Sequence, residues 1–187
     1  MSFPIQFQGI NSQEDIKTLQ NYLDEHIDSW GNVDANDYWK GRTLFHHDIT
    51  DTNAQNIMTD VIRKGISLIT KTSDIKDPIY CEHLSLARWP EGYDLQPHAD
   101  AENPPGHDRH PYYWRDYACV TFLNEDFDGG LLHFPELGME ITPKAGYSIC
   151  FPGTLKYLHG VTKITQGVRY TIAAFLTHDA SQALVNI

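Results

Sequence analysis

After Pro78 the chain consists of short β-rich runs that are broken by glycine, proline and aspartate. Many short strands with turn signals at close spacing are typical of a β-sandwich or barrel. The sequence therefore predicts an antiparallel β-structure beyond this point. The predicted strands are Ile79 to Trp89, Tyr117 to Asn124, Leu131 to Phe134, Met139 to Thr142, Tyr147 to Phe151 and Arg169 to Thr177.

The residues before Pro78 favour helices. Ser12 and Asp15 resemble a capping box, and apolar residues then recur at helical spacing, which predicts an amphipathic helix from Gln13 to Asp28. A second helix is predicted from about Thr52 to Thr70 on the same grounds. A chain of 187 residues suits a single domain. Its expected parts are a mainly helical support (1–77), a β-structured core (78–179) and a C-terminal tail (180–187).

A long loop from Ala101 to Arg115 interrupts the β-rich pattern. Long loops within compact domains are often functional. Its closing aromatic residues are equally compatible with a place in the core and with the lining of a substrate groove. Those residues are Tyr112, Tyr113 and Trp114. Three further residues are interpreted as solvated surface groups, with substrate contact as the alternative: Arg88, Arg109 and His110.

The triplet His-x-Asp occurs twice, at His46 to Asp48 and at His98 to Asp100. Because the chain contains ten histidines, one such triplet is expected by chance. Asp48 lies just before the second predicted helix, where a capping residue is expected, so the first triplet is interpreted as structural or as surface. The second triplet follows a predicted strand and precedes the long loop, which favours a functional role.

His159 and Arg169 extend the second triplet into a constellation, because His159 lies 61 residues after His98 and Arg169 ten residues after His159. Two imidazoles and one carboxylate on one face of Fe(II) leave three coordination positions open. The keto acid end of 2-oxoglutarate can occupy two of them and dioxygen the third. An arginine suits the far carboxylate, because its planar fork binds carboxylates bidentately.

Charge and cysteine content restrict the partners and the compartment. Fourteen basic against twenty-five acidic residues give a formal net charge of −11, which argues against nucleic acid and against an anionic membrane surface. The N-terminal residues contain no basic segment followed by an apolar run, so no secretory signal is predicted. Cys81, Cys119 and Cys150 form no C-x-x-C pair, which predicts free buried thiols and a cytoplasmic location.

Several motifs, in this order, resemble the 2-oxoglutarate and Fe(II) oxygenases of the prolyl hydroxylase superfamily, in particular the catalytic domain of prolyl 3-hydroxylases (the leprecan group). The resemblance covers about Tyr80 to Asp179, a little over half of the chain. The motifs are His98 to Asp100, Trp114 to Tyr117, Phe122 to Gly130, His159 to Thr162, Gly167 to Tyr170 and Phe175 to Asp179.

The resemblance implies a mainly β fold, the double-stranded β-helix, which is a distorted jelly roll of the cupin kind with N-terminal helices. It implies a dioxygenase that uses Fe(II), 2-oxoglutarate and dioxygen, with ascorbate as a reductant, to hydroxylate an unactivated C–H bond. By motif position, the iron ligands are His98, Asp100 and His159. Arg169 holds the C5 carboxylate of 2-oxoglutarate.

Two positions depart from the pattern of these relatives. Many carry tyrosine two residues before the asparagine of the Leu-Asn pair and nine residues before the first iron histidine. This chain has Phe122 and Trp89 there. Because Phe122 has no hydroxyl to help hold the cosubstrate carboxylate, another hydroxyl must substitute or Arg169 works alone. The candidates are Thr171, Thr121 and Tyr147.

The substrate is expected to be a prolyl residue in a peptide or protein, with a free amino acid or another small metabolite as the alternative. Halogenation is disfavoured, because Asp100 fills the coordination position that chloride would need. A non-catalytic metal-binding β-barrel is the alternative of another class. Arg169 argues against it, since a simple metal site has no use for a carboxylate anchor at that spacing.

Overall fold

The computed structural model describes residues 3–26, 39 and 41–183, in which two antiparallel sheets face each other. The six-stranded sheet has the order β1 (Ile5–Gln8), β9 (Tyr147–Pro152), β5 (Tyr117–Phe122), β12 (Val168–Thr177), β3 (Tyr80–Pro90) and β2 (Thr43–Phe45). The four-stranded sheet has the order β4 (Leu95–His98), β10 (His159–Val161), β7 (Leu132–Phe134) and β8 (Met139–Ile141). A third ladder joins β6 (Asp128–Gly129) to β11 (Ile164–Gln166). This is the predicted double-stranded β-helix.

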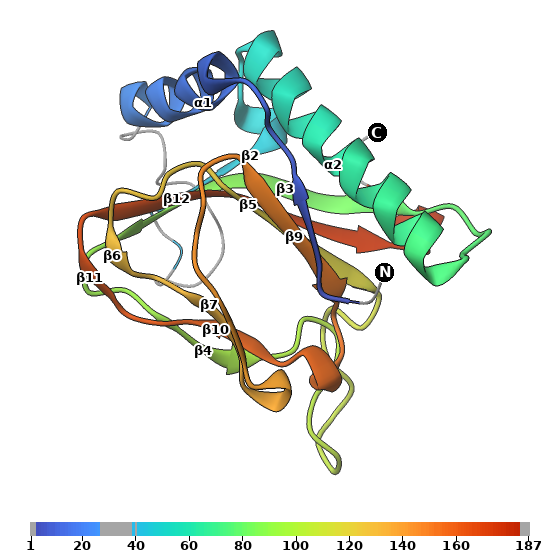
Figure 1. Cartoon of the computed structure of the whole chain (residues 1–187). Helices are drawn as coiled ribbons and strands as arrows, with labels where there is room; N and C mark the ends of the chain where they lie inside the picture. Colours follow the sequence, from blue (N-terminus) through green and yellow to red (C-terminus); the bar gives the residue numbers. More distant parts are fainter. Residues whose placement is uncertain (1–2, 27–38, 40, 184–187) are drawn as a thin grey trace.

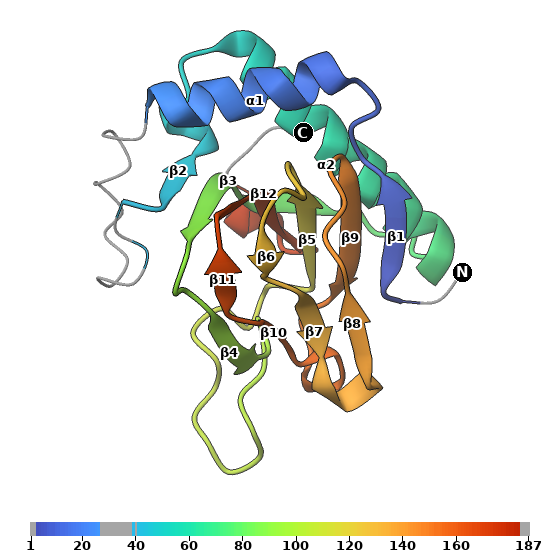
Figure 2. The same cartoon turned by 60° about the vertical axis from the view of Figure 1, so that its left-hand side comes forward.

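Two helices, α1 (Gln13–Glu25) and α2 (Thr52–Ser73), cover the outer face of the large sheet (Figures 1 and 2). The Ser12 side chain accepts a hydrogen bond from the Asp15 amide, which confirms the predicted N-terminal cap of α1. Residues 27 and 28, where this helix was predicted to end, lie outside the described part of the chain. No helix among the described residues combines the length and apolar content that a bilayer-spanning helix requires.

The cap of α2 corrects one prediction. Asp51, not Asp48, caps this helix, because the Asp51 carboxylate accepts the Ala54 amide at 2.7 Å. Asp48 belongs to the preceding 3-10 helix η2 (His46–Asp48), and its side chain is 54% exposed. The helix then continues to Ser73, three residues beyond the predicted end, and Asp74 closes it in the left-handed conformation with φ 50°.

Both edge strands of the large sheet, β1 and β2, come from the segment predicted to be mainly helical. At four and three residues they are too short to produce a readable alternation of apolar and polar side chains. The short strands β4, β6, β10 and β11 were missed for the same reason. The segment 1–77 is therefore part of the β-structure as well as its helical cover.

The two faces of β12 serve different purposes. Ile172, Ala174 and Leu176 point outward and belong to the core that the sheet forms with α1 and α2. Side chains alternate along a strand, so Arg169, Thr171, Ala173 and Phe175 point inward, between the two sheets. The inner core there includes Phe122, Phe134 and Phe151.

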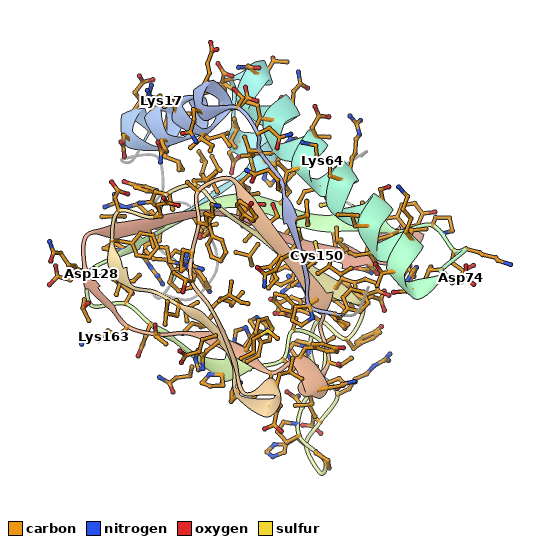
Figure 3. The ribbon with its side chains drawn as sticks, in the orientation of Figure 1. Lys17, Lys64, Asp74, Asp128, Cys150 and Lys163 are labelled. Atoms are coloured by element: carbon orange, nitrogen blue, oxygen red, sulfur yellow. The ribbon has the colours of Figure 1, made fainter. Side chains whose placement is uncertain are left out.

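The three cysteines are free and buried, as predicted, and the structure places them on the outer side of the large sheet. Cys119 and Cys150 are direct partners on β5 and β9, and Figure 3 shows Cys150 beneath α2. A Cβ atom at Gly65 of α2 would lie only 3.1 Å from the Cys150 sulfur. The glycine therefore permits the close approach of the helix to the sheet.

Candidate active site

The structure brings His98, Asp100 and His159 together at one end of the barrel. The last residue of β4, His98, pairs across the ladder with the first residue of β10, His159. The ligand atoms of the three residues all lie within 4.8 Å of one another. The Nε2 atoms of His98 and His159 lie 3.6 Å and 3.8 Å from the two carboxylate oxygens of Asp100. The predicted cluster therefore exists, and its occupation by iron remains a prediction.

Backbone carbonyls orient both imidazoles toward the cluster. The Nδ1 atom of His98 lies 3.0 Å from the Gln96 carbonyl oxygen, and that of His159 lies 3.2 Å from the Tyr157 carbonyl oxygen. Because a carbonyl only accepts, each Nδ1 carries a proton and each Nε2 keeps its lone pair for a metal. Asp100 is 4% exposed, and its Oδ2 has no hydrogen-bond partner in the described structure. This donor set fits non-haem Fe(II).

The charges of the trio also suit a cation. Burial raises the pKa of Asp100, but His159 and His98 outweigh it and hold the pKa below its usual value. Burial alone would lower the pKa of His98, yet the hydrogen bond and charge of Asp100 raise it. Burial lowers the pKa of His159 to about 4. At neutral pH the cluster thus contains an ionised carboxylate and at least one neutral imidazole.

Gly153 holds both ends of the long loop against the cluster. Its carbonyl accepts the Ala101 amide, and its amide donates to the Asp116 carbonyl, both at 2.9 Å. A Cβ atom at Gly153 would collide with the Arg115 carbonyl oxygen and would lie 3.3 Å from the Asp100 Cβ. The sequence indicated only a turn here. Its role in positioning Asp100 depends on a close approach that no local pattern reveals.

Arg169 is the second residue of β12 and points to the inner face of the large sheet. It is 2% exposed, and its guanidinium carbon lies 5.5 Å from the Trp89 ring and 5.2 Å from the Phe122 ring. Among the residues that the structure describes, it has no hydrogen bond or ion pair, and its Nε is buried without a partner. Burial lowers its pKa to about 9, so it remains charged at neutral pH.

A buried charge without a counterion is costly, so this arrangement calls for an anionic ligand. Gly130 makes room for the arginine, since a Cβ atom there would lie 3.0 Å from the Arg169 Cδ. Its φ of 63° also lies in the left-handed region that favours glycine. The described structure therefore combines a cluster of metal ligands with a buried cation on the inner face of the large sheet.

The three candidate hydroxyls lie in different places. Thr171 is 2% exposed and shares the inner face of β12 with Arg169. Thr121 was a wrong candidate, because it points to the outer face and bonds to the Ser148 hydroxyl at 2.7 Å. Tyr147 lines a cavity of about 170 Å³ together with Phe122, and no contact links it to Arg169.

Asn124 is a positioning residue that the sequence did not identify by itself. Its side-chain amide donates to the Val168 carbonyl at 2.7 Å, and its carbonyl accepts the Tyr170 amide at 2.8 Å. These bonds hold the backbone on both sides of Arg169. The Leu123-Asn124 pair within the family-like motifs was the available signal.

The first His-x-Asp triplet forms no such cluster. His46 faces the Thr59 hydroxyl at 3.4 Å, and His47 is 74% exposed. Within the described ranges, His98, Asp100 and His159 form the only group of three such side chains whose ligand atoms lie close enough together to hold one metal ion. The structural or surface interpretation of the triplet is confirmed.

The long loop places Tyr112 and Tyr113 at the surface and not in the core, whereas Trp114 is partly buried. Tyr112 and Tyr113 are 44% and 45% exposed, and the Arg109 guanidinium lies 3.1 Å from the Tyr113 ring centre. Arg88 pairs with Tyr170 on β12 and so shares the outward direction of the even-numbered residues there. Of the three groups considered for substrate contact, Arg88 therefore points away from the site.

Comparison with known proteins agrees with this geometry. The family model of the 2OG-Fe(II) oxygenase superfamily matches residues 84–177, about half of the chain. Rat prolyl 3-hydroxylase 1 is 38% identical over 73 residues, which cover 36% of this chain and 10% of that protein. Mouse prolyl 3-hydroxylase 2 is 30% identical over 114 residues, which cover 58% of this chain and 14% of that protein. The chain thus matches only a small part of the length of these relatives.

Solved structures share the fold at low sequence identity. The viral collagen prolyl hydroxylase of Paramecium bursaria Chlorella virus-1, in complex with 2-oxoglutarate, superposes with a TM-score of 0.70 at 16% identity and covers 94% of this chain and 96% of that one. A Pseudomonas putida prolyl-4-hydroxylase gives a TM-score of 0.68 at 15% identity and covers 94% and 92%. The chain belongs to the 2OG-Fe(II) oxygenase superfamily.

Proposed function

We propose that this chain is a 2-oxoglutarate-dependent dioxygenase that uses Fe(II) and dioxygen to hydroxylate a prolyl residue within a peptide or protein. The observation that carries the oxygenase chemistry is the pairing of a His-Asp-His cluster with a buried, anion-free Arg169 in one barrel. The similarity to prolyl 3-hydroxylases and to two prolyl hydroxylase structures supports the prolyl substrate.

In this proposal, His98, Asp100 and His159 hold the metal through two Nε2 atoms and one carboxylate. When bound, the metal with 2-oxoglutarate and dioxygen supplies the oxidising power that converts a C–H bond into C–OH. Arg169 binds the C5 carboxylate through its guanidinium and so fixes the orientation of the cosubstrate. Trp89 and Phe122 flank that guanidinium and exclude water, which strengthens the pairing.

The Nδ1–H groups of His98 and His159 donate hydrogen bonds to the Gln96 and Tyr157 carbonyl oxygens. These bonds keep the imidazole planes fixed during turnover. Gly153 hydrogen bonds to the backbone of Ala101, the residue after Asp100, and of Asp116 at the other end of the long loop. These bonds hold the Asp100 carboxylate in place beside the two histidines. The protein thus contributes orientation and a dry, charged pocket.

The test is a screen of proline-containing peptides and free amino acids with Fe(II), 2-oxoglutarate and air, read by mass for a gain of one oxygen. The His159→Ala protein serves as the inactive control. Oxygen gain on a peptide, together with succinate formation, supports the proposal. Turnover that gives an oxygenated free amino acid while all peptides stay unmodified would contradict the peptidyl substrate and leave the oxygenase assignment intact.

A further inference from the structure

The strand register leaves Arg169 just beyond the end of β5. The ladder between β12 and β5 begins at the pair of Thr171 with Phe122 and runs from there along the rest of β12. On the other side, β12 stays paired with β3, where Trp89 is the partner of Arg169. A regular strand therefore flanks the Arg169 backbone on one side only.

The two residues that follow β5 complete the other side. The Leu123 amide donates a hydrogen bond to the Tyr170 carbonyl oxygen at 2.9 Å. The Asn124 side chain donates to the Val168 carbonyl oxygen and accepts from the Tyr170 amide. On this side, the place of the Arg169 backbone thus depends on where Leu123 and Asn124 lie.

Helix α1 holds this pair of residues from outside the sheet. The side-chain amide of Gln20 donates to the Leu123 carbonyl oxygen at 2.7 Å. One turn further along the same face of α1, Asp24 accepts the Tyr170 hydroxyl at 2.9 Å. Burial, and then the bond to Asp24, raises the pKa of Tyr170 to about 12, so the hydroxyl keeps the proton that it donates.

Apolar packing makes α1 a firm support for these bonds. Leu19 and Leu23 of the helix are fully buried in the same core cluster as Leu123 and as Ile172 of β12. Close packing of this kind resists displacement of the helix relative to the sheet. The half-buried Gln20 side chain is therefore held over the Leu123 carbonyl, and loss of its amide would leave that acceptor without this partner.

Arg169 needs accurate placement for its proposed task. Its guanidinium lies between the Trp89 and Phe122 rings, 5.5 Å and 5.2 Å from their centres. A bidentate bond to a carboxylate requires both N–H groups to be aligned with the two oxygens. Because the side chain is enclosed, it has little freedom to compensate for a shift of its own backbone.

We propose that Gln20 is a positioning residue for Arg169. It holds Leu123 and Asn124, which in turn hold the backbone on both sides of the arginine, so that the guanidinium meets the far carboxylate of the cosubstrate. This inference rests on the proposed function, because it takes Arg169 as the cosubstrate anchor. Gln20 lies outside residues 84–177, which the family model matches, so α1 contributes to cosubstrate binding as well as to the cover of the sheet.

The test is titration of two keto acids into the protein with Fe(II) present and air excluded. 2-Oxoglutarate has the far carboxylate, whereas 2-oxopentanoate has a methyl group in its place and so binds without Arg169. Gln20→Met removes the amide donor and keeps the length and helix propensity of the side chain. Gln20→Lys restores a donor at this position. Urea unfolding of each variant shows that the helix stays in place.

Two further variants control for indirect effects. Lys17→Met is the matched control within α1, because Lys17 is an exposed residue of the same helix (Figure 3). Asp51→Ala controls for a general loss of stability, since it removes the cap of α2 and no bond to β5 or β12. Both should bind the two keto acids as the wild type does.

Gln20→Met should raise the dissociation constant of 2-oxoglutarate about 2- to 10-fold, the range of one lost hydrogen bond, and Gln20→Lys should recover part of the loss. The affinity for 2-oxopentanoate should stay constant throughout. The inference is overturned if Gln20→Met binds 2-oxoglutarate as the wild type does, or if it weakens both keto acids equally. Failure of the proposed function gives a different result: the wild type itself would bind the two keto acids with equal affinity.

Discussion

The guanidinium of Arg169 lies against the face of the Trp89 indole, with 5.5 Å between the guanidinium carbon and the ring centre. The two residues are also direct partners in the ladder between β12 and β3. A second buried guanidinium, that of Arg42, also lies over the Trp89 ring, 5.3 Å from the ring centre. Trp89 therefore contacts two buried cations, one of which is the candidate anchor for the cosubstrate.

Replacement of Arg169 by alanine should weaken 2-oxoglutarate binding roughly 30- to several thousand-fold, because loss of one partner of a buried ion pair costs on the order of 2–5 kcal/mol. Arg169→Lys should be intermediate, since it keeps the charge and loses the fork. The measurement is titration of 2-oxoglutarate with Fe(II) present and air excluded. An unchanged dissociation constant in the alanine variant would remove Arg169 from the cosubstrate site.

Replacement of Trp89 by leucine should raise the dissociation constant of 2-oxoglutarate about 2- to 30-fold, because a cation–π contact at a desolvated site contributes roughly 0.5–2 kcal/mol. Trp89→Phe keeps an aromatic face and should recover part of the loss. Iron affinity serves as the internal control and should stay constant. Equal 2-oxoglutarate affinities for the leucine and phenylalanine variants would show that the aromatic face does not position Arg169.

Replacement of His98 or His159 by alanine should abolish iron binding and turnover, because two remaining ligands hold labile Fe(II) poorly. His46→Ala, in the other His-x-Asp triplet, is the control and should retain both. Iron content after dialysis and 2-oxoglutarate consumption are the two readouts. Wild-type turnover by His98→Ala at saturating iron would mean that the cluster is not the catalytic centre.

Iron affinity should depend on pH through His98. The hydrogen bond and charge of Asp100 overcome the effect of burial and raise the pKa of His98 above 6.5. A ligating imidazole must be neutral. The iron affinity should therefore be at its maximum above that raised pKa and should fall about tenfold per pH unit below it. His159, with a pKa of about 4, stays neutral over this range. Anaerobic iron titrations between pH 5.5 and 8 test this, and a constant affinity would contradict it.

The two aspartates near the start of α2 should differ in their effect on stability. Asp51→Ala should lower the free energy of unfolding by about 0.5–2 kcal/mol, because it removes the cap on the Ala54 amide. Asp48→Ala should change it by less than about 0.5 kcal/mol, since the side chain is 54% exposed and its ion pair with His47 lies at the surface. Urea unfolding of the two variants gives both values, and equal losses would mean that the cap contributes nothing specific.

The sequence by itself predicted which residues form the candidate site. The types and order of His98, Asp100, His159 and Arg169 predicted a metal cluster with a distant carboxylate anchor, because those side chains have few other uses in combination. The long amphipathic helices were also predictable, since α1 and α2 contain several turns of apolar periodicity and Ser12 provides a local cap.

Only the tertiary structure decided which residues share a face and a neighbourhood. Thr121 and Thr171 were equivalent candidates in the sequence, but strand register turns Thr121 toward the helices and Thr171 toward the site. A shift of one residue reverses the direction of every side chain in a strand, and no local pattern specifies that register. Ring contacts such as that of Phe45 with His83 likewise join residues far apart in the chain, which meet only after the strands pair.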